Sequence, residues 1–189
     1  MMARVSRSTS DGPADRPAGS AQAQLRGGNA MVSNAPGQVS RDAIQAVLTR
    51  IGAAWTELTG VLDAIPDERE EEPGVTGEWS VKDVAGHIAF WIGHDLANAE
   101  RILRGESVQV ADWADVNEQE VAKRAGLAPG EVRAELERNH ARLISLLSEL
   151  QLDHPAAANV LATVEEDATE HIYEHLAEIR AWWERTGGS

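Results

Sequence analysis

Apolar residues recur at intervals of three and four along four long stretches of the chain, the spacing that places them on one face of an α-helix. We therefore predict helices over residues 41–64, 80–104, 129–150 and 158–185, and a shorter helix over 113–125. In the first stretch the apolar positions are Ile44, Val47, Leu48, Ile51, Trp55, Leu58, Val61, Leu62 and Ile65. No stretch alternates β-branched and polar residues as a strand would. The predicted fold class is all-α, with the four long helices packed as a four-helix bundle.

The ends of the predicted helices carry start and stop signals. Ser80 precedes the second helix, and Ser80 with Asp83 resembles a capping box in which Asp replaces the usual Glu or Gln. Pro66 ends the first helix, because proline cannot continue the helical hydrogen-bond pattern. The stretch 66–79 is acidic and contains Pro and Gly, so we predict a loop there, with Glu70–Glu72 in solvent.

The N-terminal segment differs in composition from the rest of the chain. Residues 1–40 are rich in Ser, Gly, Pro and Ala and show no apolar periodicity, so we predict a disordered N-terminal tail followed by the bundle over 41–186. Four Arg against two Asp give the tail a net charge of +2, which leaves −16 for the rest of a chain whose net charge is −14. An alternative is that Met1 is not the true start and that translation begins downstream, at Met31 for example.

Composition excludes several classes of function. The acidic body disfavours nucleic acid and anionic membranes as partners, since both would be repelled. No apolar run approaches the roughly 20 residues that span a bilayer. The chain has no Cys, which rules out disulfides and Cys-zinc sites and suits a reducing compartment. We therefore expect a cytoplasmic protein whose partner is a small molecule, and leave open a homodimer.

Histidines supply the strongest chemical signal. His171 and His175 are four residues apart in the last predicted helix, so both lie on one helix face, where two imidazoles can hold one metal ion. His87, Trp91 and His94 occupy the corresponding margin of the second helix. If the two margins face each other, His87 joins His171 and His175, and three protein ligands with an open fourth position are typical of a catalytic metal site.

Neighbouring residues have candidate roles in a pocket or in supporting the ligands. Trp91 and Trp182 are candidates for the walls of a pocket beside the histidines. Glu178 or Asp95 could orient a ligating imidazole through a hydrogen bond. His94 is a candidate substrate contact, or a fourth ligand that would close the site and make it structural.

Each of these residues also has a plain structural interpretation. A histidine at the margin of an apolar face usually bonds to a neighbouring group, and the four-residue spacing alone does not establish a metal site. The tryptophans are expected mainly in the core and in helix seams. His140 falls at a core position of the third long helix and is predicted to be structural, whereas His154 lies beside Pro155 and is predicted to be exposed.

Two segments resemble a known family. They are GEWSVKDVAGHIAFW at 77–91 and EHIYEHLAEIRAWWE at 170–184. Together they are similar to the DinB/YfiT-like superfamily of small four-helix bundles, and most similar to its ClbS/DfsB-type and maleylpyruvate-isomerase-like members, over about residues 41–185. The resemblance implies an up-down-down-up bundle. It also implies a divalent metal held by one His of the second helix and an H-x-x-x-H pair of the last, positions that His87, His171 and His175 occupy.

The resemblance leaves the reaction open. Members of the family include thiol-dependent transferases and isomerases, while ClbS-like members protect cells from a toxin. We therefore expect a metal-dependent thiol transferase or hydrolase that acts on a small electrophile, with Zn or Ni as the metal and a low-molecular-weight thiol as a possible co-substrate. The alternatives are a ClbS/DfsB-like protein that binds or detoxifies a small molecule without a metal, and a bundle that acts only by dimerising.

Overall fold

Six α-helices make up most of the part of the chain that the computed structural model describes, residues 39–108, 113–165 and 168–188. The long helices are α1 (Arg41–Ala64), α2 (Val81–Leu103) and α4 (Pro129–Glu149), followed by α5 (Ala157–Glu165) and α6 (Glu170–Arg185), and a shorter α3 (Trp113–Arg124) precedes α4. The predicted tail falls outside the described residues up to residue 38.

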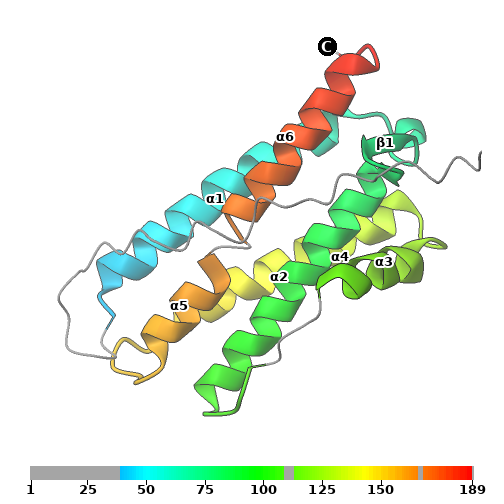
Figure 1. The fold of residues 1–189 in the computed structure, drawn as a ribbon. Helices are drawn as coiled ribbons and strands as arrows, with labels where there is room; N and C mark the ends of the chain where they lie inside the picture. Colours follow the sequence, from blue (N-terminus) through cyan, green and yellow to red (C-terminus); the bar gives the residue numbers. More distant parts are fainter. Residues whose placement is uncertain (1–38, 109–112, 166–167, 189) are drawn as a thin grey trace, which may run out of the picture. The chain divides into compact units, whose positions relative to one another are not determined.

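The helices form the predicted four-helix bundle, with α5 and α6 together as its fourth member (Figure 1). α2 packs on α4 and α5, while α1 packs on α6 and also meets α4. In Figure 1, α1 runs toward the hairpin end of the bundle, α2 and α4 both run away from it, and α5 and α6 return toward it. This is the up-down-down-up order, so the predicted fold class is confirmed.

The prediction of one continuous helix over 158–185 is wrong. α5 ends at Glu165 and α6 begins at Glu170, and Thr169 has φ −133° and ψ −75°, outside the helical region. The Thr169 hydroxyl donates a hydrogen bond to the carbonyl of Glu165 at 2.5 Å. Apolar periodicity does not report this break, because Val164 before it and Ile172 after it both remain in the core.

The predicted acidic loop at 66–79 is also partly wrong, because it contains regular structure. A single 3-10 turn (Asp67–Arg69) is followed by the short strands β1 (Pro73–Thr76) and β2 (Trp79–Ser80). The two strands pair antiparallel, with Thr76 opposite Trp79. Gly77, in the turn between them, has φ +58°, a conformation that costs glycine nothing. Strands this short carry too few residues for an alternating pattern to be visible.

Glu70 was predicted to be in solvent, and this is wrong as well. It is 2% exposed and forms an ion pair with Arg133 of α4, whose Nη2 lies 2.7 Å from its Oε1. Arg133 also donates to Asp63 at 2.9 Å, near the end of α1. Burial raises the pKa of Glu70, and the charge of Arg133 opposes that rise. The acidic segment is thereby tied to α1 and α4.

The start of α2, which carries part of the site, is fixed by the predicted capping box. The Asp83 amide donates to Ser80 Oγ at 3.2 Å, and the Ser80 amide donates to Asp83 Oδ2 at 2.9 Å. Each of the two side chains therefore accepts a hydrogen bond from the backbone amide of the other residue, the reciprocal arrangement that defines a capping box. Because Ser80 is also the last residue of β2, the hairpin and α2 are held in one orientation.

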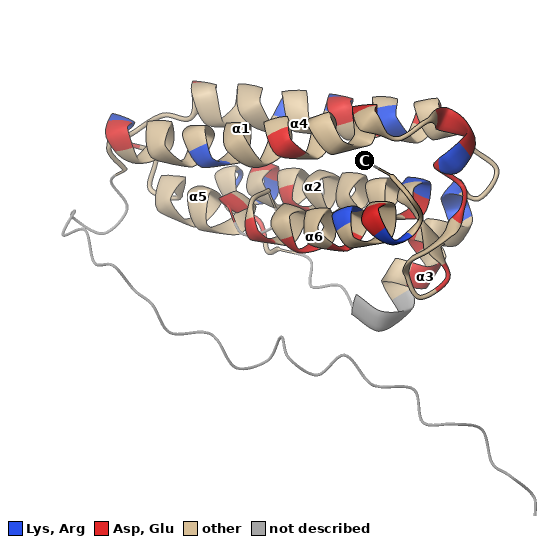
Figure 2. Cartoon of the chain, turned by 90° about the horizontal axis from the view of Figure 1, so that it is seen from above, with Lys and Arg blue, Asp and Glu red and all other residues tan. Residues whose placement is uncertain are grey.

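Charged residues of both signs are spread along the helices (Figure 2). Some of them join neighbouring helices, as do Arg142 with Glu100 at 3.1 Å and Arg180 with Glu57 at 3.1 Å. Within the described ranges, none of the helices has the length and apolar character that crossing a membrane requires.

Candidate metal centre

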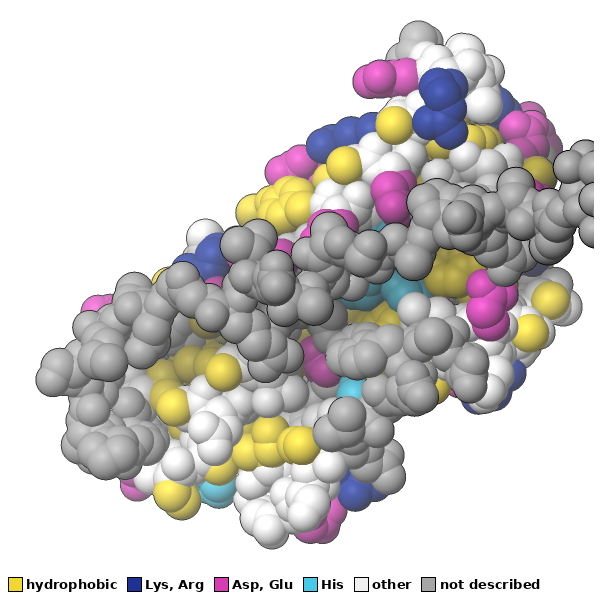
Figure 3. All heavy atoms as spheres, viewed as in Figure 1, with side chains coloured by type: hydrophobic (Ala, Val, Ile, Leu, Met, Phe, Trp, Pro, Cys, Tyr) yellow, Lys and Arg dark blue, Asp and Glu magenta, His cyan; other side chains and the backbone are white. Residues whose placement is uncertain are grey.

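Three imidazoles meet between α2 and α6. α2 contributes His87, and α6 contributes His171 and His175 from successive turns. The Nε2 atom of His171 lies 2.9 Å from the Nε2 of His87 and 2.9 Å from the Nε2 of His175. Each residue has a ligand atom within 4.8 Å of those of the other two. In Figure 3, histidine side chains reach the surface between α2 and α6, next to hydrophobic ones.

The number of close neighbours around one nitrogen, rather than the spacing itself, favours a shared cation over hydrogen bonds. A neutral imidazole nitrogen offers either one N–H or one in-plane lone pair. The Nε2 of His171 can therefore bond well to only one of its two neighbours, whereas a divalent cation can accept a lone pair from all three rings. With metal–nitrogen bonds of roughly 2.0–2.1 Å, two ligand atoms lie about 2.9 Å apart at a right angle and about 3.4 Å apart in a tetrahedron. The donor set therefore suits a divalent transition metal.

A carboxylate on α6 orients one of the rings. Glu178 Oε2 lies 2.7 Å from Nδ1 of His175, and this hydrogen bond is the main cause of the lowered pKa of Glu178. An ionised carboxylate only accepts, so Nδ1 of His175 donates this hydrogen bond, and in the neutral form of the ring Nε2 offers a lone pair to the cluster. The structure thus brings Glu178 to the imidazole of His175, and a role in orienting a metal ligand stays a prediction. For the other candidate, Asp95, it gives a contact with His94 at 3.5 Å.

Two tryptophans lie against His87. The ring of Trp79, from β2, is 5.1 Å from that of His87, and the ring of Trp91, one turn further along α2, is 6.3 Å away. Trp91 is 1% exposed, and its indole N–H donates to Asn117 Oδ1 on α3 at 3.0 Å. Sequence reasoning missed Trp79 because its segment was predicted to be a loop. The available signal was its place in the GEWSVKD motif.

Two further residues were proposed for the same pocket, Trp182 and His94, and their role there stays a prediction. Trp182 is buried near the hairpin, where the guanidinium of Arg69 stands 5.2 Å from its ring and Gly74 lies beside it. His94 packs near Trp91, with 5.1 Å between the rings, and contacts Asn98 at 3.4 Å. Among the described residues, the group of potential metal ligands consists of His87, His171 and His175 and does not include His94.

His140 has the structural role that its core position predicted. Its ring stacks on that of Trp55 in α1, with 3.8 Å between centroids and 6° between planes. Burial lowers the pKa of His140 to about 4, so the ring is neutral at physiological pH. His154, predicted to be exposed, is instead half-buried, and its Nδ1 accepts a hydrogen bond from the Ala156 amide at 3.2 Å.

A pocket of about 520 Å³ opens at the far end of the bundle, between the C-terminal turns of α2 and α4. Leu96, Leu103, Leu146 and Leu150 form its apolar part, and Glu100 and Arg142 are among its polar residues. None of its lining residues, which include His154, belongs to the cluster of His87, His171 and His175 in the first two turns of α2 and α6. The sequence pattern did not predict it, because its residues belong to separate helices.

The fold and the histidine cluster define a class of small helical bundles with a three-imidazole centre. A family model, the DinB superfamily, matches residues 50–184, and the chain belongs to this superfamily. An uncharacterised protein from Escherichia coli UTI89 has a similar structure, with a TM-score of 0.67 and 16% sequence identity over 77% of this chain and 95% of that one. No curated protein matches the chain.

A second solved structure of similar fold is YfiT from Bacillus subtilis, described as a probable metal-dependent hydrolase with an unusual four-helix bundle topology. Its TM-score is 0.60 and its sequence identity 19%, over 83% of this chain and 95% of YfiT. At such identities the likeness concerns the fold. The similarity to ClbS/DfsB-type members stays a prediction.

Proposed function

We propose that this protein is a metal-dependent enzyme that holds one divalent ion, Zn or Ni, between His87, His171 and His175. The proposal rests on one observation, that the Nε2 of His171 lies 2.9 Å from the Nε2 atoms of both His87 and His175, an arrangement in which a shared ion can bind all three rings and a single N–H or lone pair cannot bond well to both neighbours. The description of YfiT as a probable metal-dependent hydrolase supports it. The substrate would be a small electrophilic molecule, attacked by water in a hydrolase or by a low-molecular-weight thiol in a transferase.

A divalent ion held by the three imidazoles would supply Lewis acidity and would lower the pKa of a water or thiol bound at a remaining open position. The chain's own residues prepare that position. Glu178 holds the His175 ring with its Nε2 lone pair toward the cluster. Trp79 and Trp91 cover two sides of His87 with apolar surface, which limits the access of bulk water to that imidazole.

The proposed partner is a small molecule and the proposed compartment the cytoplasm. A chain without Cys needs no oxidising compartment for disulfides, and low-molecular-weight thiols are kept reduced in the cytosol. The acidic net charge of −14 is unsuited to nucleic acid as a substrate.

Elemental analysis of protein purified without a nickel column tests the proposal. We expect about one divalent ion per chain in the wild type and its loss in His175→Ala, while His154→Ala serves as the matched control and keeps the metal. Thermal melting with and without chelator then distinguishes the kinds of site, since loss of a structural ion collapses the fold and loss of a catalytic ion does not. Full metal content in His175→Ala would reject the site.

A second candidate function is binding of a small molecule without a metal. The observation that favours it is the pocket of about 520 Å³ at the far end of the bundle, a size that suits small organic ligands. Metal-free protein distinguishes the two functions. If the metal-free protein keeps its full ligand binding or protective activity, the metal-dependent proposal fails.

A further inference from the structure

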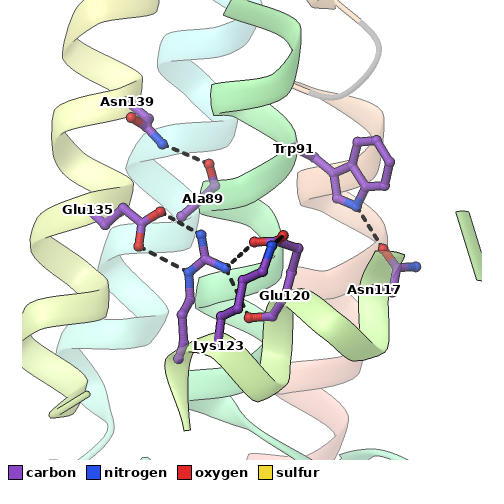
Figure 4. Close-up of polar contacts among 8 residues, drawn as sticks. Ala89, Trp91, Asn117, Glu120, Lys123, Glu135 and Asn139 are labelled. Carbon is purple, nitrogen blue, oxygen red and sulfur yellow. Dashed lines mark hydrogen bonds and ion pairs between the residues drawn. The ribbon is translucent and has the colours of Figure 1, made fainter. Parts of the chain in front are cut away.

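α3 lies over the part of α2 that carries His87, and polar side chains attach it there (Figure 4). At its C-terminal end, Arg124 forms ion pairs with Glu135 of α4 at 2.6 Å and with Glu120 at 2.9 Å. Gly86 of α2 leaves room for this arginine, because a Cβ at that position would lie 2.8 Å from Arg124 Cδ. The end of α3 is therefore fixed directly beside the residue that precedes His87.

A second attachment lies two turns earlier in α3. Asn117 Oδ1 accepts the hydrogen bond of the Trp91 indole N–H at 3.0 Å, and Figure 4 shows the indole of Trp91 directed from α2 toward α3. Trp91 is 1% exposed, so its N–H depends on partners within the protein. An indole has two side-chain torsions, and a hydrogen bond at its far edge fixes the rotation of the whole ring.

The orientation of that ring matters for His87. The Trp91 ring stands at 72° to the His87 ring, with 6.3 Å between centroids, and Trp79 covers another side at 5.1 Å. Rings packed edge to face resist rotation, because turning one requires the other to move. The His87 imidazole thus packs near two indoles, and Asn117 bonds to one of them.

We propose that Asn117 is a positioning residue for the metal centre and acts through Trp91 on the orientation of His87. This inference rests on the proposed function, since it concerns the same ion. It assigns α3 a role in the site in addition to its place in the fold. A purely structural role for Asn117 would lower stability and leave the metal environment unchanged, and this difference can be measured.

Cobalt(II) binding to the full-length protein, freed of metal, gives the required readout, because its visible absorption reports the geometry of the ligands. The variants are Asn117→Leu, which removes the acceptor, Asn117→Asp, which keeps it, and Trp91→Phe, alone and combined with Asn117→Leu. Gln119→Leu, at an exposed position of the same helix, is the matched control. Thermal melting of each variant verifies that it folds.

We expect Asn117→Leu to shift the cobalt spectrum and to weaken binding by about three- to tenfold, less than the loss of a group bonded directly to a ligand. Asn117→Asp should restore both, and Asn117→Leu should have no further effect in the Trp91→Phe protein. A wild-type spectrum in Asn117→Leu, or an equal change in Gln119→Leu, would overturn the inference. It would also be overturned if Asn117→Leu changed the spectrum of the Trp91→Phe protein as much as it changes that of the wild type. If the wild type binds no cobalt, the proposed function fails instead.

Discussion

Glu178 Oε2 accepts a hydrogen bond from Nδ1 of His175, 2.7 Å away and three residues earlier in α6. The contact joins the candidate ligand to an acid whose pKa is lowered chiefly by this hydrogen bond. Carboxylates placed in this way fix the tautomer of a metal-bound imidazole and increase its basicity. We therefore expect the pair to raise the affinity of the proposed site for a metal ion.

Replacement of Glu178 should weaken metal binding without removing a ligand. We expect Glu178→Ala to lower the affinity by about 10–100-fold, the range for groups that orient a ligating histidine. Glu178→Gln should lose less, since its amide oxygen can still accept from His175. Competition with a chromophoric chelator measures both variants. Glu184→Ala, at an exposed position of the same helix, is the control, and equal affinities in all three variants would contradict the assigned role of Glu178.

Ser80→Ala should destabilise the fold by about 0.5–2 kcal/mol, since the capping hydroxyl accepts from an amide that otherwise has no partner in the helix. Urea unfolding followed by tryptophan fluorescence measures the change in the free energy of unfolding. Ser148→Ala provides the comparison, because Ser148 is exposed inside α4, where alanine is at least as favourable. If both variants match the wild type, the capping box does not contribute to stability.

Most helix bounds were predictable because two independent signals, the apolar periodicity and the residues that cap or end a helix, agree at them. The first helix was predicted over 41–64 and observed over Arg41–Ala64, where Ser40 caps the start of a regular apolar face and Pro66 follows its end. Ser80 and Asp83 likewise marked the start of α2. Periodicity gives the buried face, and the capping residues give the ends.

What the sequence did not predict depends on contacts between distant segments. The break before Glu170 leaves the apolar face intact, so periodicity passes over it. Glu70 is an acidic residue in an acidic run, and it is buried because Arg133, from another helix, reaches it. Nothing in the local pattern of either segment reports that pairing.

In the candidate site too, the residues that helical spacing relates were predictable, and those that depend on contacts with a distant segment were not. His87, His171 and His175 occupy helix margins, and helical spacing together with the resemblance to a family was enough to group them. Trp182 follows Glu178 by one turn on the same margin, yet the hairpin beside Gly74 determines its surroundings. Trp79 belongs to that hairpin, which was not foreseen. Whether the three histidines bind a metal stays a prediction.

Glu70→Ala should be more destabilising than a change at an ordinary surface acid. It removes one member of a buried ion pair and leaves Arg133 without that partner, and such losses reach about 3–5 kcal/mol for fully buried pairs. Because Arg133 also bonds to Asp63, we expect about 2–3 kcal/mol here. Chemical unfolding measures the loss, with Glu68→Ala, an exposed neighbour, as the control. Similar small effects in both variants would show that the pair is energetically neutral.

The stacked pair of His140 and Trp55 makes the stability of the protein depend on pH. Burial lowers the pKa of His140 from 6.5 to about 4, so the unfolded chain takes up a proton at this residue before the folded chain does. The contribution of the buried neutral ring to stability is therefore complete above about pH 6.5 and is lost as the pH falls toward about 4. Allowing for partial exposure of the ring, we expect about 1–2 kcal/mol over this interval.

The variant His140→Phe isolates this effect, because phenylalanine keeps an aromatic ring against Trp55 and does not titrate. The pKa of Glu70 is raised, so protonation of Glu70 in acid increases the free energy of unfolding, whereas protonation of His140 decreases it. The pH profile of the wild type alone therefore does not isolate the effect of His140. The difference between variant and wild type cancels the contribution of Glu70. Urea unfolding at a series of pH values should give a constant difference above about pH 6.5 and a growing advantage for His140→Phe below it. A difference that stays constant down to about pH 4.5 would mean that the folded state accommodates a charged His140 without cost.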